Sequence, residues 1–356
     1  MSELLTKERL LSMGRCLLKT AITALLAVAA AVVLLTVACV IAKANIAAAM
    51  QTFFLDPLQS SYELGELVLE MIPLLFTGTA VCIMNRCGQF NMFVEGGFFL
   101  GAFVAGVLAP MLPTKTPLLP LVCMLAAALL CGVLGYVPAK MKASFGVNEF
   151  VSSLMLNYIV FWVVMYLLHG SCGDPEYINA TRYLEDYMKL PFLNEEIRLS
   201  SSTLIALAVA IVGGVFLFFT KWGYAIRITG DNASFAEYSG IKTRCAVVYS
   251  QVIGAMIAGF GGAALLLGNY YRFAWTALPH YGFDGFVVAI IAGNNPFYLP
   301  FAALFLGYLR SGALQMSRLG ILPNELIYVI QAVIIIIFGA KAFMPMVKKW
   351  RGGQQA

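Results

Sequence analysis

The chain has 356 residues, of which 61% are hydrophobic and only 12% are charged, and its mean hydropathy is +0.84. A soluble domain has roughly half apolar residues and about a quarter charged ones, so lipid must cover the excess of apolar side chains in this chain. The runs are apolar on all sides rather than alternating, which excludes a transmembrane β-barrel, and a net charge of +5 gives no reason to expect a nucleic-acid partner. The composition therefore predicts an all-α polytopic membrane protein.

The N-terminal part is predicted to be a surface segment followed by a first membrane span. Residues 1–19 are basic and mildly amphipathic, which is typical of a segment that lies on the cytoplasmic leaflet. Residues 20–42 are apolar and long enough to cross a hydrocarbon core of roughly 30 Å. A cleavable signal peptide is the alternative, because Ala42-Lys43-Ala44 resembles a cleavage site, but this apolar run exceeds the about 7–15 residues of a signal core. We therefore expect a retained span and a cytoplasmic N-terminus.

An external segment, residues 45–61, leads to a second predicted span at 62–84. The outer half of this span carries Glu63, Glu66 and Glu70. Carboxylates that face lipid are costly, so we expect these three to face other helices or a wet vestibule.

Polar residues and glycines interrupt the next apolar region, residues 85–106. Among them are Asn91, Glu95 and the pair Gly96-Gly97. Glycines let backbones approach one another, and polar side chains satisfy a broken helix only where it borders protein or water. The stretch is therefore either a broken helix beside a cavity or a short cytoplasmic turn that Asn91 caps.

The segment G-V-N-E-F-V-S-S-L-M-L-N-Y, residues 146–158, opens a fifth predicted span. Asn148 and Glu149 suit a helix N-terminus, by capping and by the positive end of the helix dipole. Asn157 lies further into the span and must hydrogen-bond across helices or to water. Such a lone asparagine is either a structural link between helices or a ligand for substrate.

Residues 169–200 form the longest polar stretch, and we expect it to be external. It is either a solvated loop or a docking surface for another protein.

Residues 221–244 lie between two apolar runs and contain the signal of a two-turn helix. Asp231 or Asn232 can cap its N-terminus, and Gly240 can supply the left-handed residue after its end. So short a helix is unstable alone in water and needs a surface, which is this protein's own helix ends or another protein. A plain solvated loop is the alternative. The face shared by residues three apart holds Phe235, Tyr238 and Ile241.

Residues 282–293 are too short to cross a bilayer and are followed by Gly, Asn and Pro, as in a broken span that lines a cavity. Asp284 is an intramembrane acid there, and its alternative role is to cap the half-helix that it begins. With the cationic segments placed inside, we predict ten spans and both termini in the cytoplasm. The remaining spans are a third ending near residue 112, a fourth at 118–137, a sixth at 203–219, a seventh at 245–268, which is rich in packing glycines, a ninth at 297–314 and a tenth at 325–338.

The sequence contains no arrangement that indicates catalysis or a metal. No Gly-Lys-Ser or Gly-Lys-Thr of a nucleotide-binding loop occurs, so this chain is not expected to hydrolyse ATP. The eight cysteines are scattered singly, and the two histidines, His169 and His280, lie far apart. We expect no cofactor bound by this chain.

Four segments resemble one family of proteins. Residues 230–241 resemble the pattern G-x-N-x-x-x-A-x-Y-x-G-I, with Phe235 where a small residue is usual, and residues 146–158 resemble G-V-N-E-V-I-S-T-L-M-L-N-Y. Residues 282–296 resemble G-F-D-G-I-A-V-A-L-L-G-x-N-N-P, and residues 90–97 resemble F-N-I-G-x-E-G-Q in part, with the bulky Phe93 in place of Gly. These patterns belong to permease subunits of bacterial ABC importers, in the branch of ribose, galactoside and nucleoside permeases.

The resemblance implies a multi-pass protein of the bacterial inner membrane that works by alternating access. It implies a transmembrane permease domain at 20–341 and a cytoplasmic tail at 342–356. The implied partners are a cytoplasmic ABC ATPase that binds ATP and Mg²⁺, a second permease subunit, and an extracytoplasmic substrate-binding lipoprotein that docks outside. The form of residues 146–158 favours a nucleoside as substrate, with a sugar as the alternative.

The resemblance also implies two sets of site residues. The first is a coupling helix that sits in a cleft of the ATPase, with Gly230, Asn232, Phe235, Ala236, Tyr238, Gly240 and Ile241. The second is a set of translocation-path candidates, with Asn91, Phe93, Glu95, Asn157, Asp284 and Asn294.

Two functions of other classes compete with an importer subunit. An ion-coupled secondary transporter would use intramembrane acids, and Asp284, Glu95 and Glu70 are available for that role. A membrane scaffold without transport is disfavoured by the broken spans.

Overall fold

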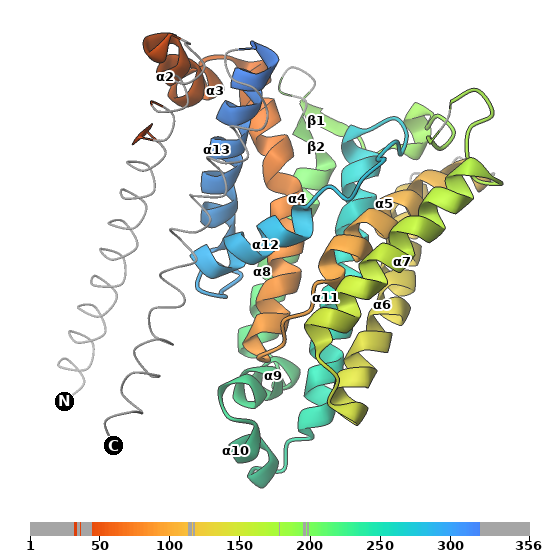
Figure 1. Ribbon diagram of the computed structural model, residues 1–356, viewed down its shortest axis with the longest axis vertical. Coiled ribbons are helices and arrows are strands. Elements are labelled where there is room, and N and C mark those ends of the chain that lie inside the picture. Colours follow the sequence, from red (N-terminus) through yellow and green to blue (C-terminus); the bar gives the residue numbers. More distant parts are fainter. Residues whose placement is uncertain are drawn as a thin grey trace. The chain divides into compact units, whose positions relative to one another are not determined.

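The computed structural model describes residues 32–33, 36, 45–112, 116, 118–177, 179–194, 197 and 199–320 (Figure 1). The described residues contain twelve α-helices, six of which are long and apolar enough to cross a membrane. The chain divides into two compact units, residues 61–308 and residues 1–60 with 309–356. The predicted segments 1–19, 325–338 and 342–356, and nearly all of the predicted first span, lie outside the described residues.

The unit that contains the chain termini has two helices where the sequence predicts only an external segment. These helices are α2, Ile46–Phe54, and α3, Asp56–Gln59. Asn45 caps α2, since its side chain accepts a hydrogen bond from the Ala47 amide at 3.0 Å. The segment before the second span is therefore largely helical, which the sequence did not indicate.

The larger unit, residues 61–308, contains the helices that match the second to eighth predicted spans. α13 begins in this unit and ends in the other. In chain order the elements are α4 Ser61–Arg86, α5 Phe93–Met111, α6 Leu119–Phe145, α7 Glu149–His169, the 3₁₀ turn η1 Asp186–Met188, the antiparallel strands β1 Phe192–Asn194 and β2 Leu199–Ser200, α8 Ser201–Phe219, α9 Lys221–Asp231, α10 Ala233–Tyr238, α11 Thr243–Asn269, α12 Tyr281–Ile291 and α13 Leu299–Arg318.

Three helices form the centre of this unit. The most apolar stretches of α4, α5 and α11 are 78%, 78% and 72% buried, against 44%, 28% and 33% for α6, α7 and α8. The central contact is tight because a Cβ on Gly101 of α5 would overlap with the Gly259 carbonyl of α11. This confirms the close packing predicted from the glycines of the seventh span. The outer helices keep large apolar side chains exposed, as a surface in contact with lipid requires.

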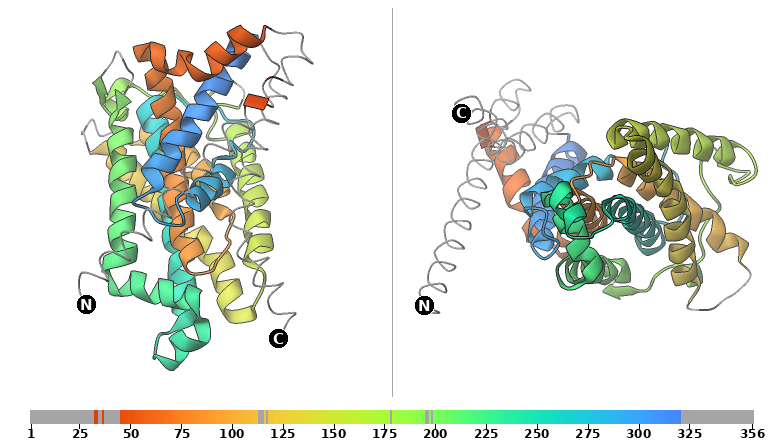
Figure 2. Two further views of the ribbon diagram at one scale, coloured as in Figure 1. Left: turned by 90° about the vertical axis from the view of Figure 1, so that its left-hand side faces the viewer. Right: turned by 90° about the horizontal axis from the view of Figure 1, so that it is seen from below.

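The larger unit has two distinct ends. One, the long-loop end, carries residues 170–200 and 270–280. The other, the short-helix end, carries α9, α10 and the turn at 87–92, and α9 and α10 lie at the bottom of Figure 1, below α8 (also Figure 2, left). α12 packs against α4 and α5.

One boundary differs from the sequence expectation. The predicted interruption covers 85–106, but α4 continues to Arg86 and α5 begins at Phe93, so the break is confined to residues 87–92. Glu95 and Gly96-Gly97 lie inside α5. The physical reason is that neighbouring helices supply the polar partners of these residues, and the helix therefore need not open around them.

Candidate functional site

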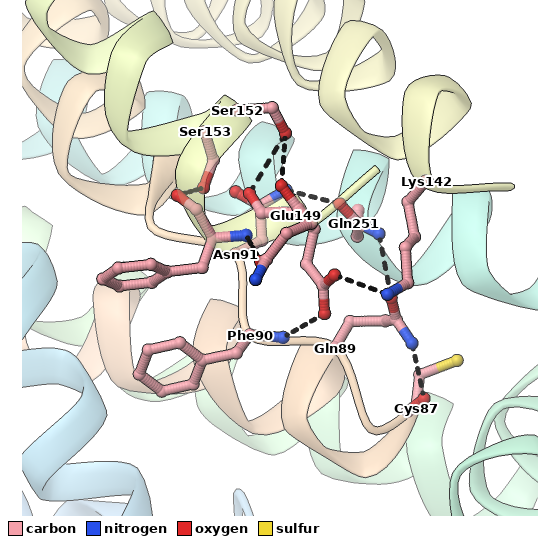
Figure 3. A network of polar contacts seen from close by, with 11 residues as sticks. Cys87, Gln89, Phe90, Asn91, Lys142, Glu149, Ser152, Ser153 and Gln251 are labelled. Atoms are coloured by element: carbon pink, nitrogen blue, oxygen red, sulfur yellow. Dashed lines mark hydrogen bonds and ion pairs between the residues drawn. The ribbon is translucent and has the colours of Figure 1, made fainter. Parts of the chain in front are cut away.

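The turn at residues 87–92 is fixed to its neighbours by buried amide side chains (Figure 3). The Phe93 amide donates to Asn91 Oδ1 at 2.8 Å, so Asn91 closes the first turn of α5. Asn91 Nδ2 donates to Gln251 Oε1 of α11 at 2.6 Å, and Gln251 Nε2 donates to Gln89 Oε1 at 3.4 Å. Both Asn91 and Gln251 are buried. Of the two alternatives, the observed one is thus a short turn, which Asn91 closes just before Met92, the N-cap residue of α5.

The first turns of α7 hold the same segment from its other side. Ser153 Oγ accepts from the Met92 amide at 2.9 Å. Asn157 accepts from the Gly96 amide at 3.0 Å through Oδ1 and donates to the Met92 carbonyl at 2.8 Å through Nδ2. The expectation that Asn157 bonds across helices is confirmed. Both ends of its amide are engaged by backbone, which is what a link between α5 and α7 requires.

An ion pair closes the network at the start of α7. Lys142 Nζ lies 2.8 Å from Glu149 Oε2, and the Phe90 amide approaches Glu149 Oε1 at 3.4 Å (Figure 3). Asn148 caps α7 as predicted, because its Oδ1 accepts from the Phe150 amide at 2.9 Å. Residues 146–158 therefore hold the turn between α4 and α5 in place.

Phe93 is a core residue. Its side chain is 1% exposed, and it lies against Gly97 and against Gly135 of α6, where an added Cβ would stand 3.5 Å from the ring. The bulky aromatic side chain fills room that these two glycines leave.

Glu95 joins α5 to the start of α12. The carboxylate is 1% exposed, and it accepts hydrogen bonds from the His280 amide at 2.6 Å and from the Gly282 amide at 2.5 Å. These amides belong to the first turn of α12, where backbone donors lack partners within the helix and the dipole favours a negative charge. The sequence offers capping of this half-helix as the alternative role of Asp284, and the structure gives two of the amide contacts to Glu95. Asp284 lies in the first turn, but Glu95 provides the cap.

The other end of α12 is fixed by the last residues of α4. The predicted short span is confirmed, since α12 has 11 residues and is followed by two left-handed residues, Gly293 (φ 65°) and Asn294 (φ 53°). Arg86 donates to the Asn294 carbonyl at 2.8 Å through Nε and to the Gly293 carbonyl at 3.2 Å. Asn85 Nδ2 donates to Asn294 Oδ1 at 3.1 Å.

The predicted short helix in residues 221–244 is present as α10, Ala233–Tyr238, and both of its ends are satisfied locally. Asn232 Oδ1 accepts from the Phe235 amide at 3.0 Å. Gly240 has φ 79°, and the Ile241 amide donates back to the Ala236 carbonyl at 2.9 Å, which is the long bond of a Schellman motif. The predicted caps are confirmed.

The surface of α10 is divided between a buried and an exposed side. Ala236 is fully buried against the rest of the protein, whereas Phe235 is 56% exposed and Tyr238 is 94% exposed. Ile241 is half-buried, so only two of the three residues predicted to share a face are open to a partner. Two large aromatic side chains on a six-residue helix leave an apolar surface uncovered at this end.

The sequence misses the helix that carries α10. α9 spans Lys221–Asp231, and Thr220 caps it by accepting from the Gly223 amide at 3.1 Å. The Thr-x-x-Gly start and the apolar Trp222 and Ile226 were available as signals. A Cβ on Gly230 would overlap with the Arg86 carbonyl, so the backbone of α9 touches the end of α4. A contiguous series of contacts therefore runs from α10 through α9 and Arg86 to the end of α12.

Two residues that organise the site, Gln251 and Ser153, were not singled out from the sequence, and each bonds a segment distant in the chain. Asn85 and Arg86 are among the polar residues that interrupt residues 85–106, but no contact with the end of α12 was predicted for them. Gln251 was detectable as a polar residue inside an apolar span.

Burial raises the pKa of the Cys87 thiol in the turn to about 11, so this cysteine stays protonated at neutral pH. In the part of the chain that the structure describes, no group of three or more His, Cys, Asp and Glu residues could hold a metal ion.

Comparison with known proteins gives one family. The family model described as branched-chain amino acid transport system / permease component matches residues 64–339. Similar curated proteins include the guanosine ABC transporter permease protein NupP of Bacillus subtilis, 31% identical over 79% of this chain and 82% of that protein. The nucleoside ABC transporter permease protein NupB of Lactococcus lactis is 29% identical over 82% and 83% of the two chains.

A sugar transporter subunit is also similar. The glucose ABC transporter permease protein TsgB13 of Haloferax volcanii is 28% identical over 93% of this chain and 89% of that protein. No solved structure matches the chain with significant similarity.

Proposed function

The chain belongs to the family of branched-chain amino acid transport system / permease components and is the membrane permease subunit of an ABC transporter, and from this premise we propose that it imports a nucleoside. The observation that supports transport driven by a separate partner is the doubly capped α10 with its exposed Phe235 and Tyr238. A six-residue helix held at both ends by its own caps presents a fixed apolar surface to a partner. That partner is a separate ATPase subunit, whose ATP hydrolysis drives alternating access.

The proposed topology has ten spans, with the short-helix end and both termini in the cytoplasm. Of the Lys and Arg residues of the larger unit, those at the short-helix end are Arg86, Lys140, Lys142, Lys221, Arg227, Lys242 and Arg244. Retention of cations on the cytoplasmic side supports this orientation. In this orientation α10 lies in the cytoplasm, where ATP is found, and residues 170–200 lie on the outer side of a bacterial inner membrane.

The proposed partners divide between these two ends. The ATPase binds α10 and also binds ATP and Mg²⁺, whereas this chain binds neither ATP nor Mg²⁺. A substrate-binding lipoprotein docks at the long-loop end, and a second permease subunit completes the path through the membrane.

The contacts narrow the proposed translocation path to the surroundings of α12. Asn91, Asn157 and Glu95 have side chains engaged by neighbouring helices, and Phe93 is packed in the core. Asp284 and Asn294, at the two ends of α12, are half-buried. A short helix held at both ends is an element that can move as one body between two arrangements, as alternating access requires.

A nucleoside is favoured over a sugar because two of the similar permeases named above are nucleoside or guanosine permeases, while a sugar remains the alternative through the glucose permease. An ion-coupled secondary transporter is disfavoured, since Glu95, one of its three proposed ion-site acids, is occupied by two backbone amides.

Removal of the exposed face of α10 tests the docking role. We expect Phe235→Ala with Tyr238→Ala to abolish co-purification of the ATPase and ATP-driven nucleoside uptake, without change in thermal stability, because neither side chain is buried. Tyr166→Ala is the matched control, as Tyr166 is 79% exposed on α7, away from α10. An intact complex and normal uptake in the double variant would refute the docking role.

A further inference from the structure

The long-loop end of the larger unit contains a cavity that the site described above does not include. Its volume is about 520 Å³, within the range of about 300–1,000 Å³ that small-molecule pockets have. Its walls come from the outer end of α4, the segment around η1 and β1, and the residues that follow α11. The lining includes Tyr62, Glu66, Lys189, Phe192, Asn269 and Tyr271.

Lys189 is the unusual member of this lining. Its residue surface is 7% exposed, and its ammonium stands 3.3 Å from the centre of the Tyr271 ring and 5.5 Å from that of Phe192. Within the described residues no carboxylate lies within ion-pairing distance of this ammonium. A buried cation is costly unless it is paired, and the ring contact offsets only part of that cost. The ammonium has three donors, and an acceptor placed in the cavity would satisfy them.

The lining also offers acceptors. Glu66 of α4 lies beside Tyr62, whose hydroxyl donates to Glu66 Oε1 at 3.2 Å. The lining thus combines a cation and aromatic rings with the carboxylates of Glu66 and Asp186. A complementary ligand is flat and aromatic, carries a carbonyl and a ring nitrogen as acceptors on one edge, and carries N–H or hydroxyl donors elsewhere.

We propose that this outer cavity receives a 6-oxopurine nucleoside, with Lys189 bonded to the O6 and N7 edge of the base, Phe192 stacked on its face, and Glu66 accepting from its donors. Lysine is a known partner of the O6 and N7 atoms of guanine, and aromatic side chains stack on any base. A 6-aminopurine presents a donor where Lys189 needs an acceptor, so the site discriminates against adenosine. The inference rests on the proposed function, since it requires that the importer takes nucleosides.

Uptake by the complete importer in proteoliposomes tests the assignment. In Lys189→Gln we expect the kcat/KM for guanosine to fall roughly 10- to 100-fold, the loss that one good base-edge contact carries. Adenosine uptake should change by less than about threefold, so the ratio between the two nucleosides shifts. A merely structural role would not move this ratio. Tyr271→Phe should keep uptake of both nucleosides.

Arg272→Gln is the matched control. Arg272 is also a cation on a tyrosine ring, 4.1 Å from the centre of Tyr177, but it does not line the cavity. It should leave both uptake rates unchanged. A direct readout that needs no variant is photolabelling of the wild-type permease–ATPase complex, without binding protein, by an azido-guanosine. The adduct should fall on the peptides that contain Lys189 or Tyr271.

The outcomes separate the inference from the proposed function. If the wild-type importer takes up no nucleoside, the proposed function fails. If it takes up guanosine, but Lys189→Gln keeps the guanosine-to-adenosine ratio and no adduct maps to the cavity, the inference alone is overturned. Equal loss of both nucleosides together with loss of binding-protein association would also overturn it, because Lys189 would then dock a protein side chain.

Discussion

The two short helices of the larger unit, α10 and α12, are held in opposite ways. α10 takes its caps from Asn232 and Gly240, which immediately flank it in sequence. α12 takes its partners from Glu95 and Arg86, which lie roughly two hundred residues earlier in the chain. Both solutions satisfy the backbone groups that a helix end leaves unpaired.

The difference has a mechanical consequence. A helix that completes its own caps keeps its conformation when it moves against its neighbours, which suits a surface that engages a partner. A helix capped by two other spans keeps its position only while those spans stay in place, so a shift of α4 or α5 must move α12 or break its hydrogen bonds. The contacts from α9 through Arg86 connect α10 to α12. Substitutions at the contacts of each helix test whether the two are coupled.

Glu95→Leu should have the largest effect, because it removes the distant cap of α12. Two buried amides would lose their acceptor, and we expect a loss of roughly 2–5 kcal/mol in stability. Thermal unfolding of the purified protein should therefore shift to clearly lower temperature, and uptake should be abolished. Glu95→Gln, which keeps one acceptor oxygen, should fall between Leu and wild type.

Glu176→Leu provides the control for loss of a carboxylate. Glu176 is an exposed residue of the long loop, so its replacement should change stability by no more than about 0.5 kcal/mol. If Glu95→Leu unfolds at the wild-type temperature, then α12 does not depend on α5 for its cap.

Arg86→Gln should have a smaller effect on stability and a distinct effect on function. It removes two hydrogen bonds to the carbonyls that follow α12, at a cost of about 1–3 kcal/mol. The ATPase should still bind and hydrolyse ATP, but hydrolysis should no longer be matched by uptake. The measurement is the ratio of solute imported to ATP hydrolysed in proteoliposomes.

Arg227→Gln is the control for this variant. Arg86 and Arg227 both lie over the Phe218 ring, at 5.9 Å and 5.1 Å, but Arg227 makes no hydrogen bond to the end of α12. An unchanged import ratio in Arg86→Gln, or an equal loss in both variants, would rule out a specific link through Arg86.

The same contrast explains what the sequence could predict. The caps of α10 and α7 and the shortness of α12 were predicted, because each rests on residues within a few positions of the helix end. The Glu95 cap was not predicted, and the sequence offered only Asp284 as an alternative cap, since Glu95 lies 187 residues before the Gly282 amide that it accepts from. The role of Arg86 was missed for the same reason, because its partners are about two hundred residues away.

Segments whose folding depends on a neighbouring surface were also missed. α2 and α3 have only nine and four residues, too few for a helical period to be recognised with certainty, and α9 is short enough that its helical signal merges with that of a basic loop. The outer cavity was beyond prediction, since its walls come from three segments that only tertiary packing brings together.

Gly240→Leu tests the local side of the comparison and should have the smallest effect on the fold. Gly240 has φ 79° and nothing within 4 Å of an added Cβ, so the substitution costs only the strain of the left-handed backbone, about 1–2 kcal/mol. The end of α10 should fray, and ATPase association and uptake should fall while the spans stay folded.

Gly146→Leu is the control, because it carries the same backbone strain at the end of α6, with φ 68° and equally open surroundings. If both variants reduce ATPase association equally, backbone strain anywhere at the short-helix end is sufficient to weaken the complex with the ATPase. A loss confined to Gly240→Leu would mean that the shape of α10 itself is what the ATPase engages.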